Sequence, residues 1–388
     1  MGERIAKLQA AMQAAGFDAA IIMQARDLFY YTGTAQPCNL LVFARGEPFL
    51  WARRAMEFVR RESKLRNILE GSGFSEIKQQ MGEAGLTGGV LGVTEDAIPA
   101  VIYNKMANLF GGFELRNISP LVLEQRMIKD EDEIAAVREA ARMSLVAHRV
   151  VLNNLRPGIS EIELSGKILG ALRAAGAESI IRNRRWDASL PPDGVMASGC
   201  NTWQISGQAM TVTGVGLGSS LAWGASAKAI NYGELLVVDL PCNRAGYHCD
   251  ITRTYVAGRA TDEQKQAFHK VRQIQERVLE LIRPGRACAE LYQAARSTAE
   301  ELGCGAWFQG YGRMQGQYIG HGLGLECDEP PVLDPGSRVI LQENMVLAIE
   351  PKLIIPGWGA VALEDDVLVT GDGYELLPAP ARILFEVT

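Results

Sequence analysis

Five residues in the second half of the chain have the types and the order of ligands in a metal site. They are Asp239, Asp250, His321, Glu350 and Glu364. Four hard carboxylate donors with a single imidazole suit paired manganese, cobalt, iron or zinc ions that share bridging carboxylates. The sequence therefore predicts a site for two divalent cations.

The first two acids are expected to face one another across a β-hairpin. Asp239 follows an apolar run, and a tight turn centred on Arg244 and Ala245 would place it directly opposite Asp250. Carboxylates that oppose each other on one face of an antiparallel pair stand about 5 Å apart, and they repel unless a cation neutralises them. This hairpin thus predicts one half of the metal site.

The pattern repeats further along the chain. Glu350 follows another apolar run, and a turn centred on Gly357 would set it opposite Glu364. A single acid at a strand end is usually a solvated cap or turn former, so each residue alone has a structural explanation. Two hairpins that each oppose two acids are harder to explain in that way, because burying uncompensated carboxylates is costly to a marginally stable domain.

Composition and length exclude several classes of protein. A chain of 388 residues is long for one core, so two domains are expected. The net charge of −6 and the absence of a Lys/Arg-rich run disfavour a nucleic-acid partner. No apolar stretch approaches the roughly 18 residues of a membrane span, and the N-terminus is typical of an amphipathic helix rather than of a signal peptide. Seven cysteines without a C-x-x-C pair indicate reduced thiols in the cytoplasm.

The elements that must position the five residues fall into two parts. Residues 1–122 alternate helical and strand periods, which predicts a small α/β domain. Residues 123–388 open with a long amphipathic helix and carry every candidate ligand on predicted strands or at their ends. We therefore expect an α+β protein whose larger, C-terminal domain is catalytic.

The motifs around the five residues resemble those of the pita-bread metallopeptidases, which include aminopeptidase P, prolidase and creatinase. The motifs that carry the resemblance are Gly246–Thr254, Gly320–Glu326, Glu350-Pro351 and Leu363–Asp365. The likeness is weak over residues 1–120 and strong over 230–370. It implies a pita-bread catalytic domain preceded by a creatinase-like N-terminal domain, in a homodimer.

The same resemblance implies a role for each candidate ligand. Asp239 would chelate one ion, Asp250 and Glu364 would bridge both, and His321 and Glu350 would hold the other. The ions would make hydroxide available from a shared water near neutral pH, and Glu350 would take the proton as general base. The implied activity is that of an Xaa-Pro aminopeptidase or dipeptidase that attacks a small peptide with a metal-bridged hydroxide.

Three groups that face the substrate in such peptidases are missing from this chain. Trp223 stands near the place of one family histidine, Asp328 near that of a second, and Ala362 replaces an arginine. The nearest remaining imidazole is His248, two residues before Asp250 and so on the same strand face, although a structural role is favoured for it. The candidate substrate-binding residues are therefore His248, Trp223 and Asp328.

Two alternatives to a peptidase stay open. The same two-metal site could act on a non-peptide small molecule, as a C–N hydrolase or a C–S lyase does, and the lost histidines favour this alternative. The other possibility is an inactive binding module. The retention of all five ligands argues against it, because an inactive protein has no reason to keep a costly acidic cluster.

Overall fold

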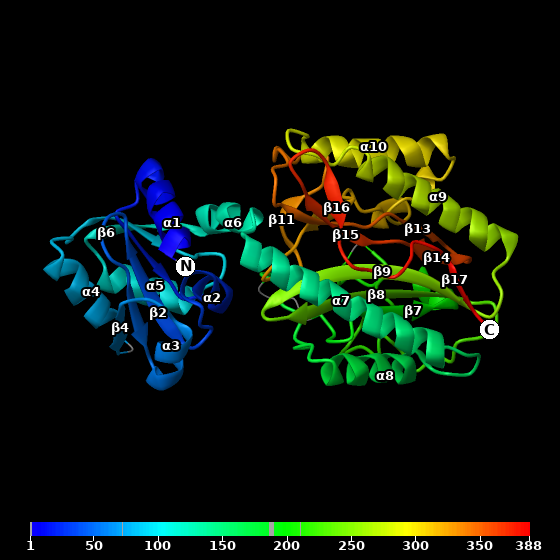
Figure 1. Ribbon diagram of the computed structural model, residues 1–388, viewed down its shortest axis with the longest axis horizontal. Helices are drawn as coiled ribbons and strands as arrows, with labels where there is room; N and C mark the ends of the chain where they lie inside the picture. The colour runs from blue at the N-terminus through cyan, green and yellow to red at the C-terminus, as the bar shows by residue number, and fades with distance from the viewer. Residues whose placement is uncertain (1, 72, 186–189, 210) are drawn as a thin grey trace. The chain divides into compact units, whose positions relative to one another are not determined.

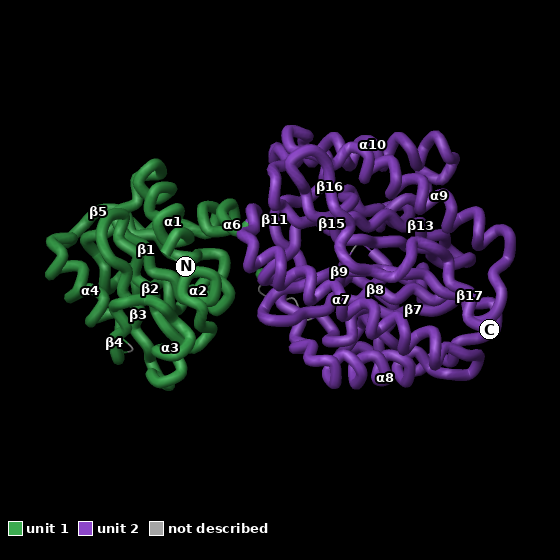
Figure 2. Tube along the Cα trace, in the orientation of Figure 1, with its two compact units in different colours: residues 1–126, 184–187 green, residues 127–183, 188–388 purple. Residues whose placement is uncertain are grey.

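The computed structural model (Figure 1) describes residues 2–71, 73–185, 190–209 and 211–388. The chain forms two compact units (Figure 2), which comprise residues 1–126 with 184–187, and residues 127–183 with 188–388. The boundary predicted between residues 122 and 123 falls inside helix α6, which spans Ser119–Met127. No helix in the described part of the chain is long and apolar enough to cross a membrane.

The first unit is a six-stranded mixed sheet with helices. Its strands run in the order β4-β3-β2-β1-β5-β6. They are β1 Ala19–Ile22, β2 Cys38–Phe43, β3 Phe49–Ala52, β4 Asn67–Glu70, β5 Gly89–Val93 and β6 Phe113–Asn117. The helices that precede α6 are α1 Gly2–Ala15, α2 Ala25–Thr32, α3 Met56–Glu62, α4 Phe74–Glu83 and α5 Ala100–Leu109. This unit is the α/β domain that the alternating periods predict.

The strands described in the second unit form three sheets. Their orders are β17-β9-β8-β7, β11-β10-β12-β15-β16 and β13-β14. The first sheet consists of β7 Val195–Ser198, β8 Leu235–Arg244, β9 Tyr247–Ala257 and β17 Phe385–Val387. The second consists of β10 Gly320–Gly322, β11 Glu329–Val332, β12 Val346–Ile349, β15 Asp365–Val369 and β16 Tyr374–Leu376. The third pairs β13 Lys352–Ile355 with β14 Gly359–Ala362.

Four long helices cover these sheets. They are α7 Glu131–Asn154, α8 Glu161–Ala174, α9 Asp262–Leu279 and α10 Cys288–Glu301. Helix α7 starts at a capping box of Asp130 and Glu133, which satisfies backbone donors that a helix start leaves unpaired. Helices α7 and α8 pack on the sheet that contains β7, β8 and β9 (Figure 1). Helix α9 packs on β13 and β14, and helix α10 packs on α9. The predicted α+β fold is confirmed.

The turn between β8 and β9 lies one residue later than the sequence predicts. Its two central residues are Ala245 and Gly246, whose φ angles of 52° and 84° are both in the left-handed region. Two-residue hairpin turns of this kind match the twist of the flanking strands. Strand β8 accordingly runs to Arg244, which pairs with Tyr247.

The predicted direct pairing of Asp239 with Asp250 is therefore wrong. Asp239 pairs with Thr252, and Asp250 pairs with Pro241. The physical reason is that a hairpin turn displaced by one residue shifts every cross-strand partner by two. Because side chains two residues apart lie on the same face of a strand, the two acids still share a face as diagonal neighbours.

The second hairpin keeps the register that was predicted. Strand β13 pairs with β14 from Lys352 and Ala362 onward, and extending this register by two residues sets Glu350 opposite Glu364. Both acids lie just outside the strands, Glu350 directly after β12 and Glu364 between β14 and β15. The two acids therefore sit where strands of two different sheets meet.

Candidate metal centre

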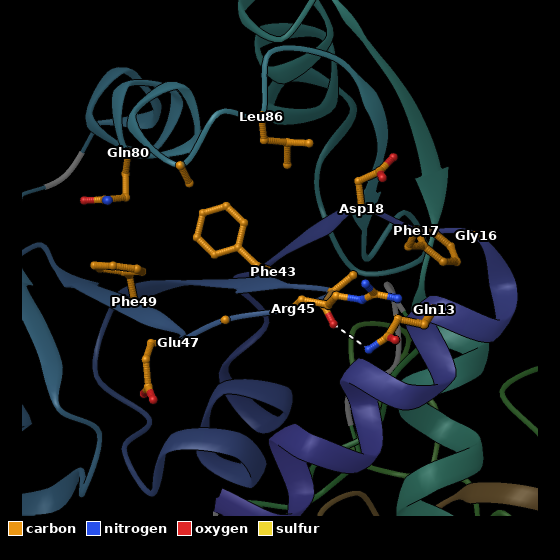
Figure 3. A pocket seen from close by; sticks show the side chains of 13 residues that line it. Gln13, Gly16, Phe17, Asp18, Phe43, Arg45, Glu47, Phe49, Gln80 and Leu86 are labelled. Carbon is orange, nitrogen blue, oxygen red and sulfur yellow. Dashed lines mark hydrogen bonds between the residues drawn. The ribbon is translucent and has the colours of Figure 1, made fainter.

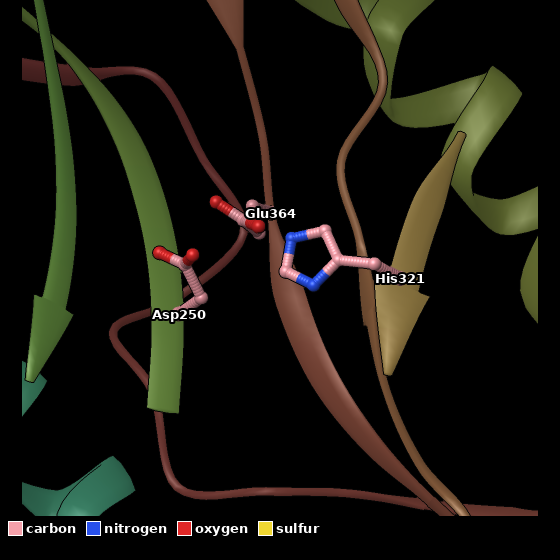
Figure 4. Close-up of side chains that lie close together, drawn as sticks. All are labelled: Asp250, His321 and Glu364. Carbon is pink, nitrogen blue, oxygen red and sulfur yellow. The ribbon is translucent and has the colours of Figure 1, made fainter. Parts of the chain in front are cut away.

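Three of the predicted ligands form a close group in the second unit. Asp250 comes from β9, His321 from β10 and Glu364 from the segment between β14 and β15. One potential ligand atom of each lies within 4.8 Å of the others. Figure 4 shows the three side chains pointing toward one another from these separate elements.

The two remaining predicted ligands adjoin this group. The Nε2 atom of His321 lies 3.5 Å from Oε1 of Glu350. Asp239 is close enough to Asp250 for their side chains to hydrogen-bond. The structure thus brings together all five residues chosen from the sequence, and their role as metal ligands stays a prediction.

Burial and mutual repulsion make this cluster a poor place for free carboxylates. Burial is the largest cause of the raised pKa of Asp239, Asp250 and Glu364. The negative charge of Asp239 raises the pKa of Asp250 further, and the charge of Asp250 does the same to Glu364. Such a cluster is stabilised by protons or by cations.

The imidazole is oriented in the way that metal-binding histidines require. The Nδ1 atom of His321 lies 3.0 Å from the carbonyl oxygen of Gly322, so that an Nδ1–H donates there and Nε2 faces the acids. Although burial lowers the pKa of His321, the charges of Asp328, Glu350 and Asp250 raise it to about 9. Two of the groups that raise this pKa, Glu350 and Asp250, are predicted ligands whose charge a divalent ion would neutralise.

The carboxylate oxygens also fit a divalent ion. Oδ2 of Asp250 accepts a hydrogen bond from Cys327 Sγ at 3.1 Å, whereas its buried Oδ1 has no partner among the described residues. Buried polar atoms nearly always have a partner, so this oxygen is suited to a cation. Likewise Thr252 Oγ1 donates to Oε2 of Glu364 at 2.6 Å, and within the described ranges no hydrogen bond to Oε1 of Glu364 is found.

His248, one of the candidate substrate-binding residues, is engaged by the backbone. It is fully buried, its Nε2 accepts a hydrogen bond from the N–H of Arg182 at 3.1 Å, and its Nδ1 lies 3.1 Å from the carbonyl oxygen of Gly324. Both ring nitrogens therefore hold loops in place. This geometry favours the structural role over substrate binding.

The other two candidates lie at the margin of the cluster. Oδ1 of Asp328 is 4.0 Å from Nδ1 of His321, and 52% of its side chain is exposed. Trp223 is partly buried and packs against an apolar group that includes Val237 and Ala362. Val237 and Ala362 each precede a predicted ligand by two residues, so the apolar cluster against which Trp223 packs includes residues of the segments that carry the acids.

One charged residue of the centre, Lys352, is not among the residues predicted from the sequence. Its Nζ donates to Oε2 of Glu350 at 2.5 Å and to Oγ1 of Thr211 at 2.6 Å. Although burial lowers the pKa of this ammonium, the charges of Glu350 and Asp239 raise it well above its usual value. The signal in the sequence was its spacing, because a residue two positions after Glu350 on an extended chain points to the same side.

The N-terminal unit has a pocket of its own, of about 630 Å³ (Figure 3). Two of its polar lining residues have partners: Gln13 donates to the carbonyl of Ala44 at 2.7 Å, and Asp18 accepts from the N–H of Val90 at 2.7 Å. The pocket and the five predicted ligands belong to different units. We therefore assign the chemistry to the cluster of acids.

Comparison with known proteins agrees with this division. The model of metallopeptidase family M24 matches residues 135–371, and that of the creatinase/prolidase N-terminal domain matches residues 4–128. The uncharacterized peptidase YqhT of Bacillus subtilis is 29% identical over 374 residues, which are 95% of this chain and 96% of that protein. The Xaa-Pro dipeptidase of Pyrococcus furiosus is 27% identical over 387 residues, 99% of this chain and 100% of that one.

A solved structure gives the same result in three dimensions. The Xaa-Pro dipeptidase from Bacillus anthracis superposes with a TM-score of 0.83 at 27% identity, and the match covers 99% of both chains. The predicted architecture, a pita-bread domain preceded by a smaller α/β domain, is thereby confirmed.

Proposed function

The chain belongs to metallopeptidase family M24, and on this premise we propose that it cleaves small Xaa-Pro peptides with the help of divalent metal ions. The observation that carries the proposal is the convergence of Asp250, His321 and Glu364, with Glu350 and Asp239 beside them. Two relatives described above are Xaa-Pro dipeptidases, which supports the choice of substrate. Two ions, the number predicted from the sequence, would share Asp250 and Glu364.

Metal ions held by these residues would polarise the scissile carbonyl and make a water molecule acidic enough to attack near neutral pH. Among the protein groups, we assign the role of general base to Glu350; this assignment is supported by its Oε1, which lies 3.5 Å from His321 Nε2, while its Oε2 is held by Lys352. His321 is kept in one orientation by the Gly322 carbonyl. These contacts leave the acidic centre preorganised, which lowers the cost of reaching the transition state.

A non-peptide substrate is the second candidate. The observation that favours it is the apolar and acidic character of the three positions at which family peptidases carry histidines and an arginine. Trp223 packs against the apolar cluster to which Ala362 belongs, and Asp328 adds a negative charge next to His321. A small C–N or C–S substrate would not need the missing groups.

The test is metal analysis followed by a substrate screen. The metal-free protein is reloaded with manganese, cobalt, iron or zinc and offered Xaa-Pro dipeptides and tripeptides beside non-peptide amides and sulfonium compounds. We expect cleavage of Xaa-Pro peptides that is lost in Glu350→Gln and kept in Glu301→Gln, a matched change at an exposed acid on α10. Turnover of a non-peptide compound alone would favour the second candidate, and failure to bind any divalent ion would contradict both.

The homodimer and the cytoplasmic location expected from the sequence stay predictions. Gel filtration with light scattering tests the first, and localisation of a tagged protein tests the second.

A further inference from the structure

We infer that Lys352 is a positioning residue of this centre: its ammonium group holds one oxygen of Glu350 so that the other faces the ions and the substrate. The inference rests on the proposed function, because it assigns Lys352 a part in the same centre. Lys352 is distinct from the five predicted ligands and from the candidate substrate-binding residues.

The contacts of Lys352 form a short chain of polar groups that ends at Glu350. Nζ donates to Glu350 Oε2 at 2.5 Å and to Thr211 Oγ1 at 2.6 Å. Thr211 in turn hydrogen-bonds the side chain of Tyr318. With Oε2 engaged in this way, Oε1 of Glu350 is the oxygen that lies 3.5 Å from His321 Nε2, at the group of ligands.

Burial makes this ion pair different from a surface salt bridge. The side chains of Lys352 and Glu350 are 2% and 8% exposed. Lysine is almost never buried unless it is paired, and a charge-assisted hydrogen bond inside a protein is short and directional. Because water does not screen the pair, the ammonium restricts the carboxylate to a single orientation.

The side-chain amide of Gln309 fixes the backbone of both members of the pair. The N–H of Lys352 donates to Oε1 of Gln309 at 3.0 Å, and Nε2 of Gln309 donates to the carbonyl of Glu350 at 3.3 Å. Gln309 is fully buried. The two charged residues are therefore held at a set distance before any substrate arrives, as a positioning role requires.

The cross-strand partner of Lys352 explains why a cation is supplied from this strand. Lys352 pairs with Ala362, and paired residues share one face of the hairpin. Ala362 stands where the resemblance leads us to expect an arginine, and its methyl group leaves that face open to a long side chain. The positive charge thus comes from β13 instead of β14.

Substitution of Lys352 tests the inference through a split between kcat and KM. With an Xaa-Pro dipeptide, Lys352→Met should lower kcat by about 10²–10³-fold, the usual effect of losing a preorganised donor in an active site. KM should change by no more than about threefold, because the contact acts on the protein base rather than on the bound substrate. Lys352→Arg should recover most of the activity, and Lys167→Ala, at an exposed lysine on α8, should behave as the parent.

An exchange of the cross-strand pair provides a second test at constant composition. Lys352→Ala combined with Ala362→Lys returns a cation to the same face and should be faster than Lys352→Ala alone by about tenfold or more, within the coupling range of contacting residues. Circular dichroism and thermal unfolding verify that each variant is folded. An exchange variant as slow as Lys352→Ala would overturn the inference.

The visible spectrum of the cobalt-loaded protein separates this inference from the proposed function. Reorientation of Glu350, a predicted ligand, should alter the Co²⁺ bands in Lys352→Met and leave them nearly unchanged in Lys352→Arg, whether or not peptides are cleaved. Unchanged bands in Lys352→Met would overturn the inference while the proposed function stands. So would a gain of one bound ion in Lys352→Met, which would mean that the ammonium occupies a metal position.

Discussion

Removal of the metal should make the stability of the second unit depend on pH between about 6.5 and 9. The pKa of His321 is 6.5 in an unfolded chain and about 9 in the folded protein, where Asp328, Glu350 and Asp250 oppose the effect of burial. A group whose folded pKa is raised contributes stability that is fully present below its unfolded pKa and is lost as pH rises through the folded value.

The size of this effect follows from the shift. A pKa difference of about 2.5 units corresponds to about 3 kcal/mol, at 1.36 kcal/mol for each unit. Burial and mutual repulsion also raise the pKa of Asp250 and of Glu364, so these two carboxyl groups likewise make proton binding more favourable in the folded state than in the unfolded state. The free energy of unfolding should therefore fall as pH rises across the window.

Urea denaturation after treatment with a chelator, at pH 6.5, 7.5, 8.5 and 9, measures this fall. His321→Gln should flatten the profile, and His269→Gln, at an exposed histidine on α9, should leave it unchanged. Divalent ions should flatten it as well and raise the midpoint, since they bind the folded state and displace the protons. A metal-free profile that is flat, or that rises with pH, would refute the reasoning.

Predictions for three further variants follow from the geometry of the centre. Asp250→Asn should reduce metal content as well as turnover, because Oδ1 is buried without another partner in the described chain; elemental analysis measures the loss, and full metal content would contradict it. His248→Ala should lower the free energy of unfolding by about 1–3 kcal/mol with little change in KM, because both ring nitrogens hold backbone groups; a large rise in KM would point to substrate binding instead. Trp223→His combined with Asp328→His should raise the cleavage of Xaa-Pro dipeptides over that of the parent, and a parent already as fast as its relatives would contradict this expectation.

Much of the fold was predictable because its signals are local. The alternation of helix and strand in the first 122 residues depends on periods of a few residues, and the capping box at Asp130 and Glu133 marks the start of α7 from four consecutive positions. The register of the second hairpin also followed from the sequence, because Gly357, with a φ of 78°, marks its turn clearly.

The first hairpin shows where local reasoning fails. The predicted turn, centred on Arg244 and Ala245, differs by one residue from the observed turn, centred on Ala245 and Gly246. The residue types at the centre of either turn are compatible with a turn. Only the pairing of β8 with β9 selects the second, which moves Asp239 from Asp250 to Thr252. The identities of the acids survived the error because a shift of two residues keeps each side chain on its face.

The types and the order of the residues available for a metal centre could be predicted from the chain, since motifs are contiguous and strand periods are short. Which of these residues come into contact depends on tertiary packing. Thr211 and Lys352 are 141 residues apart, yet their side chains are 2.6 Å apart beside Glu350. Such proximity results from the packing of a loop that contains Thr211 against strand β13, and packing depends on the whole chain rather than on any window of it.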